Sequence, residues 1–307
     1  MGKILVIGSS NLDLIAKMDR FPLAGETLEG KAFLQAMGGK GANQAVAAYK
    51  SGSEVKFVTS LGNDNYGRNI LKKFSEQGIN MTSTLLVDDK PTGTAMIWVD
   101  DSGENSIVII PGANNMLTSD YIVAIEDEIS NADIIMLQME IPYETVKTVC
   151  DIAYSKGTKV MLNVAPAREL DISVLKAIHV LVVNETEAEI VASEKISEIG
   201  EDAIAGKLIS LGVKNVVLTM GEKGSLFKNK DKTLQIPAFN VNSVDTTAAG
   251  DTFCGALAAG ISNNKSWEEA LKFATAAAAL CVTKMGAQPS IPSEKEICEF
   301  MKEKIAI

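Results

Sequence analysis

The most constraining feature of the sequence is a regular alternation, from about residue 115 onward, of short apolar runs and segments with helical spacing. The expected helices are residues 119–131, 142–156 and 201–211, and the expected strands are residues 133–137, 159–162, 180–183 and 215–220. An apolar run at residues 3–8 adds a buried strand, and the last hundred residues are expected to be helical at 250–261, 267–285 and 293–304. Strands and helices in alternation predict an α/β fold, with a doubly wound, mostly parallel sheet and helices on both faces.

Two early segments break this rhythm. Residues 94–99 and 106–110 flank a short loop that contains Gly103, which is typical of a hairpin, and residues 27–37 are strand-like with no helix beside them. We expect one domain over residues 1–307, carrying a small antiparallel sheet built from segments near 13–37 and 92–110. This sheet is expected to have an apolar face that packs against another surface, formed by Met96, Trp98, Ile107 and Ile109. The sheet could be a lid, a dimer surface or both, and an ordinary edge hairpin remains open.

Charge and composition narrow the classes of function. The 307-residue chain carries a net charge of −10 without a dense Lys/Arg run, so we expect neither nucleic acid nor a membrane as partner. A small anionic ligand stays open, because a cation can shield it. No apolar run approaches the roughly 20 residues of a membrane span, and we expect no secretory signal. Four scattered cysteines without a Cys-x-x-Cys pair fit reduced thiols, so a cytoplasmic location is expected.

The single histidine limits the chemistry further. His179 begins an apolar run, which favours a structural role. A Ser-His-Asp triad would have no other imidazole to use. We therefore expect any general base to be a carboxylate.

A glycine-rich turn, Gly38-Gly-Lys-Gly-Ala-Asn43, precedes a segment of helical spacing. Glycines allow a ligand to approach the backbone, and a helix N-terminus directs amide groups at that ligand. Lys40 and Asn43 add donors that suit hydroxyl oxygens. The turn favours ligand contact, with a purely structural turn as the alternative.

A second turn, Asp245-Thr-Thr-Ala-Ala-Gly-Asp251, also opens an expected helix. Ala248, Ala249 and Gly250 are small, so their backbone amides are accessible to an oxyanion or a phosphate. Asp251 stands beside them as a candidate base. An N-cap role would explain an isolated Asp251, but it explains the run of small residues less well.

Polar residues follow two expected strands, at the edge where open α/β sheets bind ligands. Asn184 and Glu187 suit a hydrated Mg²⁺, although the same pair could simply cap the next helix. The segment 219–224 could hold a nucleotide or could be an ordinary turn. Neither a P-loop nor a Gly-x-Gly-x-x-Gly fingerprint of a dinucleotide site is supported.

Taken together, these motifs resemble the ribokinase family of carbohydrate kinases along essentially the whole chain. Residues 38–48 are similar to the family's N-terminal signature, residues 245–256 to its C-terminal signature, Asn184–Glu187 to its Asn-x-x-Glu motif, and residues 286–290 to the end of its cation site. The resemblance implies the doubly wound fold with a β lid, a homodimer formed through that lid, and ATP-dependent phosphorylation of D-ribose at O5 to give D-ribose 5-phosphate.

The resemblance also implies a role for each matching residue. A sugar pocket would be formed by Asn11, Asp13, Gly39, Lys40, Gly41, Ala42, Asn43, Glu140 and Asp251. Asp251 would be the general base, and the amides of Ala248, Ala249 and Gly250 would form an anion hole. The ATP site would comprise Asn184, Thr219, Met220, Gly221, Glu222, Lys223, Gly224, Gly250, Asp251 and Thr275, and Glu187 would organise Mg²⁺. A K⁺ ion would bind Asp245, Thr247, Cys281, Lys284, Gly286 and Ser290, mostly through backbone carbonyls.

Three alternatives to this function remain open. A related kinase could act on deoxyribose or another sugar. A non-catalytic sensor of sugar or nucleotide could use the same fold, although a sensor has no need of Asp251. A nucleoside hydrolase is disfavoured, because the expected Asp-rich metal cluster near the N-terminus is absent.

Overall fold

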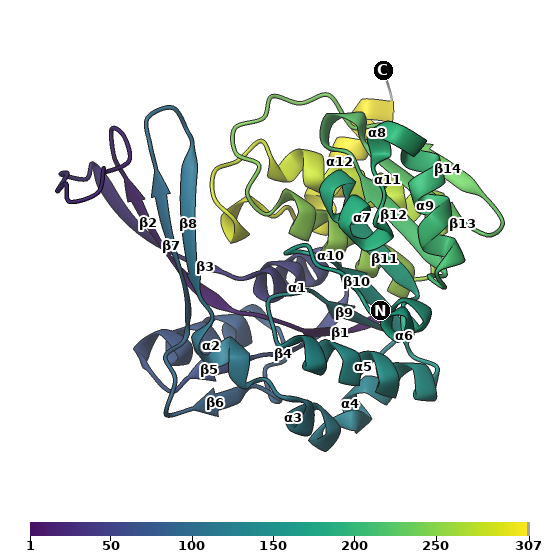
Figure 1. The fold of residues 1–307 in the computed structure, drawn as a ribbon, viewed down its shortest axis with the longest axis horizontal. Helices are drawn as coiled ribbons and strands as arrows, with labels where there is room; N and C mark the ends of the chain where they lie inside the picture. The colour runs from purple at the N-terminus through teal and green to yellow at the C-terminus, as the bar shows by residue number, and fades with distance from the viewer. Residues whose placement is uncertain (306–307) are drawn as a thin grey trace.

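The computed structural model describes residues 1–305 and contains a main sheet of eight strands in the order β14-β13-β12-β11-β10-β9-β1-β4 (Figure 1). Its strands are β1 (Lys3–Ile7), β4 (Glu54–Val58), β9 (Ile134–Leu137), β10 (Lys159–Asn163), β11 (Val180–Asn184), β12 (Asn215–Thr219), β13 (Ser225–Asn229) and β14 (Thr233–Ile236). Neighbours from β4 to β12 pair in parallel, and β13 and β14 complete the sheet as antiparallel strands. The α/β fold with a mostly parallel sheet is therefore confirmed.

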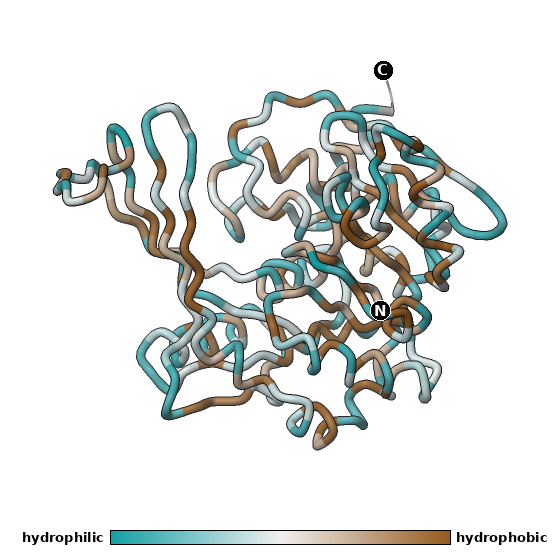
Figure 2. The backbone as a smooth tube through the Cα atoms, in the orientation of Figure 1, coloured by the Kyte–Doolittle hydropathy of each residue, from teal (hydrophilic) through white to brown (hydrophobic). Residues whose placement is uncertain are grey.

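Helices cover both faces of the main sheet. One face is covered by α1 (Lys40–Lys50), α2 (Asn65–Gln77), α10 (Ala249–Ser262), α11 (Trp267–Cys281) and α12 (Glu294–Ile305). The other is covered by α3 (Ser119–Ala124), α4 (Glu126–Ser130), α5 (Tyr143–Lys156), α6 (Ile172–Ala177), α7 (Glu185–Ala192), α8 (Ile196–Ile199) and α9 (Glu201–Ser210). Strand β1 contributes to both cores, because Ile4 and Val6 face one and Leu5 and Ile7 the other. Figure 2 shows the buried strands largely in brown.

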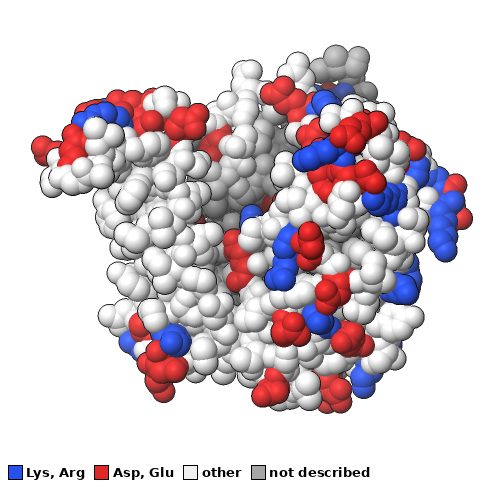
Figure 3. All heavy atoms as spheres, viewed as in Figure 1, with Lys and Arg blue, Asp and Glu red and all other residues white. Residues whose placement is uncertain are grey.

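A second sheet of four strands, which we call the lid, projects from the body in the order β3-β2-β7-β8 (Figure 1). It comprises β2 (Asn11–Lys17), β3 (Ala32–Gly38), β7 (Gly93–Val99) and β8 (Asn105–Ile110). Its outer pairs are antiparallel, as expected, but the central pair β2–β7 is parallel, because both strands leave the body from the same edge. Figure 3 shows the surface hollowed between the lid and the helical body.

The pairing register corrects one expectation about the lid. Met96 pairs with Val108, whereas Ile97 pairs with Ile107, so Met96 and Ile107 lie on opposite faces. The four residues expected to share one apolar face therefore divide between two. The face that carries Asp13 turns toward the body, because Asp13 lies beside Glu140. The opposite face carries Met96, Trp98 and Val108.

Several element boundaries differ from expectation. The segment expected as one helix over residues 119–131 is divided into α3 and α4 at Ile125. The strand expected over residues 27–37 begins only at Ala32. Smaller elements are β5 (Ser60–Gly62), β6 (Leu85–Val87) and the 3₁₀ helices η1 (Gly112–Met116), η2 (Gly221–Lys223) and η3 (Gln288–Ser290). No helix in the described part of the chain is long and apolar enough to cross a membrane.

Candidate active site

The sequence motifs meet at the carboxyl end of the main sheet, where the order of strands reverses around β1 and β9. Ser9 follows β1, and its Oγ donates to Glu140 Oε2 over 2.6 Å. The Lys40 amide, at the start of α1, donates to the same oxygen over 2.9 Å. Three segments far apart in the sequence thus share one carboxylate, at the position where open α/β sheets bind ligands.

The glycine turn allows α1 to begin against β1. Gly39 has a φ of 90°, a left-handed conformation that glycine adopts without strain. A Cβ on Gly41 would lie 2.6 Å from the carbonyl carbon of Gly8, so no side chain fits between helix and strand. The close approach brings the Lys40 amide to Glu140 and allows Asn43 to reach Asp251, next to the hollow beneath the lid.

Asp13 lies on β2, on the face of the lid that turns toward this hollow. Burial raises the pKa of Asp13 to about 7, and the nearby Glu140 carboxylate adds to the rise. Asn11, two residues earlier, is buried and accepts from Asn114 Nδ2 over 2.8 Å. Both predicted sugar ligands from the lid therefore lie at its base, and Asn114 fixes the orientation of Asn11.

Asp251 lies in the first turn of α10 and is buried. Its Oδ2 accepts from Asn43 Nδ2 and its Oδ1 from Gln44 Nε2, each over 3.0 Å. Burial raises the pKa of Asp251, while the positive charge of Lys40 and the two amide donors oppose the rise. The pKa of Lys40 is itself raised: burial alone would lower it, but the charges of Asp251 and Glu140 prevail. Asp251 and Lys40 thus stabilise each other's ionised forms.

The turn that begins α10 presents free backbone donors. Ala248 adopts a left-handed conformation with a φ of 61°. The Ala249 amide donates to Thr246 O over 3.2 Å. In the described chain, the amides of Ala248, Gly250 and Asp251 have no acceptor. A Cβ on Gly250 would meet nothing within 4 Å, so this side of the turn is open. Free amides at a helix N-terminus are suited to an anion.

Asp245 joins the two loops of the predicted cation site. Its Oδ1 accepts from the amide and hydroxyl of Thr247, over 2.9 and 2.6 Å, and its Oδ2 from the Gly286 amide over 2.8 Å. Burial works to raise the pKa of Asp245, but these donors lower it overall, so the carboxylate is ionised at neutral pH. Cys281 Sγ lies 3.7 Å from Thr247 O and 3.0 Å from Ser290 Oγ, so Ser290 is held close to the loop that contains Thr247.

The side chain of Lys284 does not join these loops. Its ammonium group instead pairs with Glu296 on α12, over 2.9 Å. Of Lys284, only the backbone carbonyl remains available to a cation.

Asn184 and Glu187 form a capping box at the start of α7. The Glu187 amide donates to Asn184 Oδ1 and the Asn184 amide to Glu187 Oε2, each over 2.8 Å. Glu187 is nevertheless part of the site: burial raises its pKa, and Asp251 adds to that rise while Lys40 opposes it. In the described chain its Oε1 accepts no hydrogen bond, so one carboxylate oxygen is free for another partner.

The predicted nucleotide residues lie along the neighbouring strand ends. Segment 219–224 follows β12 as a tight loop closed by the Met220 amide, which donates to Gly224 O over 2.8 Å. Lys223 pairs with Glu185 over 3.3 Å and with Glu201 over 3.6 Å. Thr275 Oγ1 donates to Leu271 O within α11, so its hydroxyl hydrogen is already used. Like Asn184 and Asp251, the predicted nucleotide residues Lys223 and Thr275 thus have side chains with partners in the protein, and Thr219 Oγ1 donates to Val183 O over 3.3 Å.

Sequence reasoning overlooked four polar residues that support the site. Ser9 binds Glu140, Asn114 binds Asn11, and Gln44 and Gln138 form a chain of hydrogen bonds to Asp251. Gln44 directly follows the glycine motif and Gln138 directly follows a strand, so position alone could have marked these two. His179 lies at the amino end of β11, where burial and two lysines lower its pKa to about 4, consistent with a structural role.

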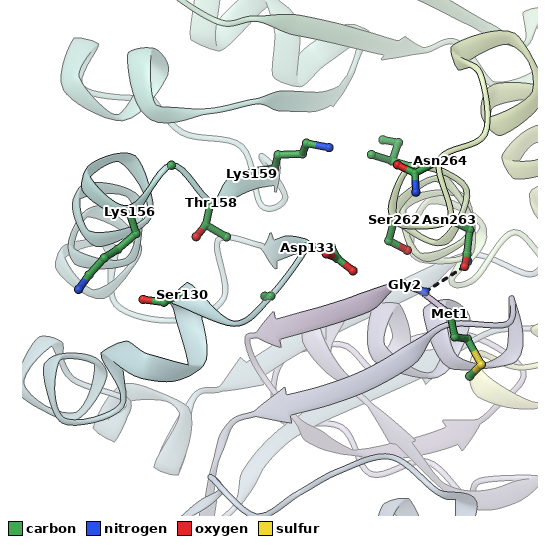
Figure 4. Close-up of a pocket in the computed structure, with 13 residues that line it drawn as sticks. Met1, Gly2, Ser130, Asp133, Lys156, Thr158, Lys159, Ser262, Asn263 and Asn264 are labelled. Atoms are coloured by element: carbon green, nitrogen blue, oxygen red, sulfur yellow. Dashed lines mark hydrogen bonds between the residues drawn. The ribbon is translucent and has the colours of Figure 1, made fainter.

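A cavity of about 530 Å³ lies elsewhere, at the amino ends of the strands (Figure 4). Gly2, Asp133 and Lys159 line it, together with the end of α10 at Ser262. None of the predicted site residues borders this cavity. The candidate site is therefore identified by the convergence of charged and amide groups around Asp251, and this cavity lies apart from it.

Comparison with known proteins gives consistent matches. The model of the pfkB family carbohydrate kinases matches residues 1–294. The chain is 40% identical to a ribokinase of Haemophilus influenzae over 303 residues, 97% of this chain and 98% of that protein. It is also 40% identical to a deoxyribokinase of Salmonella typhi over 300 residues, with the same coverage of both chains.

Solved structures agree with these matches. A ribokinase of Arabidopsis thaliana, in complex with ribose and ATP, superposes with a TM-score of 0.91 at 34% identity, covering 98% of this chain and 99% of that one. A ribokinase of Thermotoga maritima gives a TM-score of 0.90 at 40% identity, covering 98% of this chain and all of that one, 100%. Family model, relatives and fold therefore agree, and the chain belongs to the pfkB family of carbohydrate kinases.

Proposed function

We propose that the protein phosphorylates D-ribose at O5 with ATP, giving D-ribose 5-phosphate. The observation that carries this proposal is the position of Asp251, a buried carboxylate next to the free amides that begin α10. Asp251 Oδ would take the proton of the sugar hydroxyl as its oxygen attacks the γ-phosphorus. The bond from phosphorus to the bridging oxygen then breaks, and ADP leaves.

The remaining residues bind and orient the two substrates. Asp13, Asn11 and Glu140 supply acceptors for sugar hydroxyls, and Lys40 with Asn43 supplies donors. The amides around Gly250 would stabilise charge on the transferred phosphoryl group, which is the main task in phosphoryl transfer. The complex of the Arabidopsis relative with ribose and ATP supports this choice of substrates. We propose that residues 1–307 act as a single cytoplasmic domain with the lid closing over the sugar.

Two cations fit the residues present. Glu187 has a free carboxylate oxygen near Lys40 and Asp251, and this position suits a hydrated Mg²⁺, which neutralises phosphate charge when bound. The carbonyls of Asp245, Gly286 and Ser290 accept no hydrogen bond in the described chain. They suit a K⁺ ion, with Thr247, Cys281 and Lys284 as neighbours. Such an ion would lie beside the amide turn and keep it in place.

The lid supplies the proposed homodimer surface. Its outward face carries Phe33, Met96, Val108 and Ile110, which are 62%, 41%, 50% and 41% exposed. Exposed strand edges with an apolar face are a liability unless another chain covers them. A second copy of the chain would bury this face.

Phosphorylation of deoxyribose is the second candidate, because identity to the Salmonella deoxyribokinase also reaches 40%. Release of ADP should be measured over a panel of pentoses and hexoses, and the phosphorylated carbon of the product assigned by NMR. Ribose should give the highest kcat/KM and a product phosphorylated at O5. A higher kcat/KM for deoxyribose would select the second candidate. Sugar binding without any release of ADP would indicate a sensor and overturn both.

A further inference from the structure

Two glutamines connect the candidate base to the interior of the protein. Gln44 lies in α1, and Gln138 directly follows β9; each side chain is 1% exposed. Neither residue borders the open side of the site. Amide groups buried this deeply need partners, so their hydrogen bonds reveal what they hold in place. Of the two amides, only Gln138 Oε1 has no partner in the described chain.

The direction of each hydrogen bond follows from the carboxylate. An ionised Asp251 can only accept, so Gln44 must present Nε2, which lies 3.0 Å from Asp251 Oδ1. The same Nε2 donates its second hydrogen to Asn163 Oδ1 over 3.1 Å. Gln44 Oε1 is left to accept from Gln138 Nε2 over 2.7 Å. Both hydrogens of Gln44 Nε2 are therefore used, and Gln44 Oε1 accepts one hydrogen bond, so the rotation of this amide is fixed.

A second, parallel contact holds the other carboxylate oxygen. Asn43 Nδ2 donates to Asp251 Oδ2 over 3.0 Å, and Gln288 Nε2 lies 3.4 Å from Asn43 Oδ1. Asn43 is expected to form some of its hydrogen bonds with the sugar, whereas Gln44 is enclosed by protein. Gln44 is thus the donor to Asp251 that stays in place when substrate binds.

We propose that Gln44 is a positioning residue for Asp251, and that Gln138 keeps the Gln44 amide in the orientation that this requires. The inference rests on the role of Asp251 as general base in the proposed function. Gln44 would aim the carboxylate at the sugar hydroxyl without contacting either substrate. Misaligned catalytic groups lose rate steeply, because phosphoryl transfer depends on alignment.

The charges around Asp251 explain why a neutral donor matters there. Lys40 faces it from α1, Glu140 from the loop after β9, and Glu187 from α7, while Cys254 lies one turn further along α10. Lys40 is the one positive charge in this group, against two further carboxylates. Gln44 therefore adds stabilisation to the ionised carboxylate without adding another charge.

The test compares Gln44→Met and Gln138→Met with Val46→Ala. Methionine keeps the length of glutamine but removes its donors, and Val46 is a buried residue of the same helix without a contact to Asp251. We expect Gln44→Met to lower kcat about 10- to 100-fold and to change the KM values for sugar and ATP less than about threefold. The acid limb of its pH–kcat/KM profile should move upward by about one pH unit. Gln138→Met should lower kcat and raise the pH of the acid limb by less than Gln44→Met does. Val46→Ala should change neither kcat nor the acid limb.

The glutamine variants test the positioning role of Gln44, and a separate variant of Asp251 tests the proposed function. Wild-type kcat and pH profile in a folded Gln44→Met protein would overturn it. So would a loss of kcat that is equal at every pH and matched by Val46→Ala. If Gln44→Met fails to fold, Gln138→Met decides by the same criteria. Full activity of Asp251→Asn would instead show that the proposed base is wrong, whatever the glutamine variants do.

Discussion

Asn43 Nδ2 donates to Asp251 Oδ2 over 3.0 Å, although 208 positions separate the two residues in the sequence. The contact exists because α1 and α10 pack closely, with Gly255 of α10 against Ala47 and Ala48 of α1. The glycine turn therefore carries the proposed sugar ligands and also, through α1, a partner for the proposed base on another helix.

Replacement of Gly255 by alanine should separate these two helices. The added Cβ would lie 2.4 Å from Ala47 Cβ and 2.6 Å from the Ala48 amide nitrogen. We expect the free energy of unfolding to fall by about 1–3 kcal/mol, since overpacking typically costs this much, and kcat to fall with it. Urea titration and turnover measurements check both.

Gly206→Ala is the matched control, because its Cβ would meet only Lys228 Cε at 3.6 Å. Alanine within α9 should leave stability unchanged or raise it by about 0.5–1 kcal/mol. Equal changes in the free energy of unfolding and in kcat for Gly255→Ala and Gly206→Ala would contradict the close packing of α1 and α10.

The pKa of Asp13 predicts a pH dependence of stability. Because its pKa is raised to about 7 in the folded protein, the folded state binds more protons than the unfolded state between about pH 4 and 7. Stability should therefore be greatest below pH 4 with respect to this group, and fall as the pH rises toward 7. The loss should be on the order of 2–4 kcal/mol, and Asp13→Asn should remove it. Unfolding curves of the sugar-free protein and the variant at several pH values test this. The prediction would be contradicted if the free energy of unfolding of the wild type and that of Asp13→Asn changed equally with pH.

The sequence predicted strands β1, β9, β10, β11 and β12 of the main sheet, because buried parallel strands form continuous apolar runs bounded by glycine and polar turns. It did not predict β4, β13 and β14, which mix apolar residues with exposed or half-buried polar ones. It also predicted the segments that form β3, β7 and β8 of the lid, but not which side chains share a face, for a physical reason. Strands such as β8 are exposed along their whole length, so no buried face imposes alternation, and the register that separates Met96 from Ile107 appears only in the paired structure. Of the candidate site, the sequence predicted the residues that lie within its motifs. Asn114 follows no motif and its partner Asn11 is distant in sequence, so only the folded structure reveals its role.

Potassium should activate the enzyme through Asp245. The carboxylate joins the loops at Thr247 and Gly286, so a cation bound to their carbonyls would fix the amide turn that begins α10. Loss of one oxyanion donor typically costs about 2.7–4 kcal/mol of transition-state stabilisation, so potassium should raise kcat more than sugar affinity.

Turnover is measured with potassium chloride against choline chloride at equal ionic strength. Asp245→Ala should abolish the activation, and the exposed Asp231→Ala should retain it. Equal rates in both salts would exclude the cation site.

A charge on the outward face of the lid should prevent dimerisation. Val108 is 50% exposed on that face, whereas Val123, at 55%, lies on α3 away from the lid. We expect the wild type and Val123→Lys to sediment as dimers at micromolar concentration, and Val108→Lys as a monomer. A monomeric wild type, with or without ribose, would be inconsistent with the proposed dimer.

The most direct test of the account is the turnover of Asp251→Asn with ribose and Mg²⁺-ATP. Asparagine retains the shape of the side chain but cannot accept the hydroxyl proton, and general-base catalysis contributes roughly 10²- to 10⁴-fold in rate. We predict a loss of kcat near the upper end of this range, with ribose binding by calorimetry close to that of the wild type. Near-normal turnover in the folded variant would contradict the assignment of Asp251 as the base and, with it, the proposed mechanism.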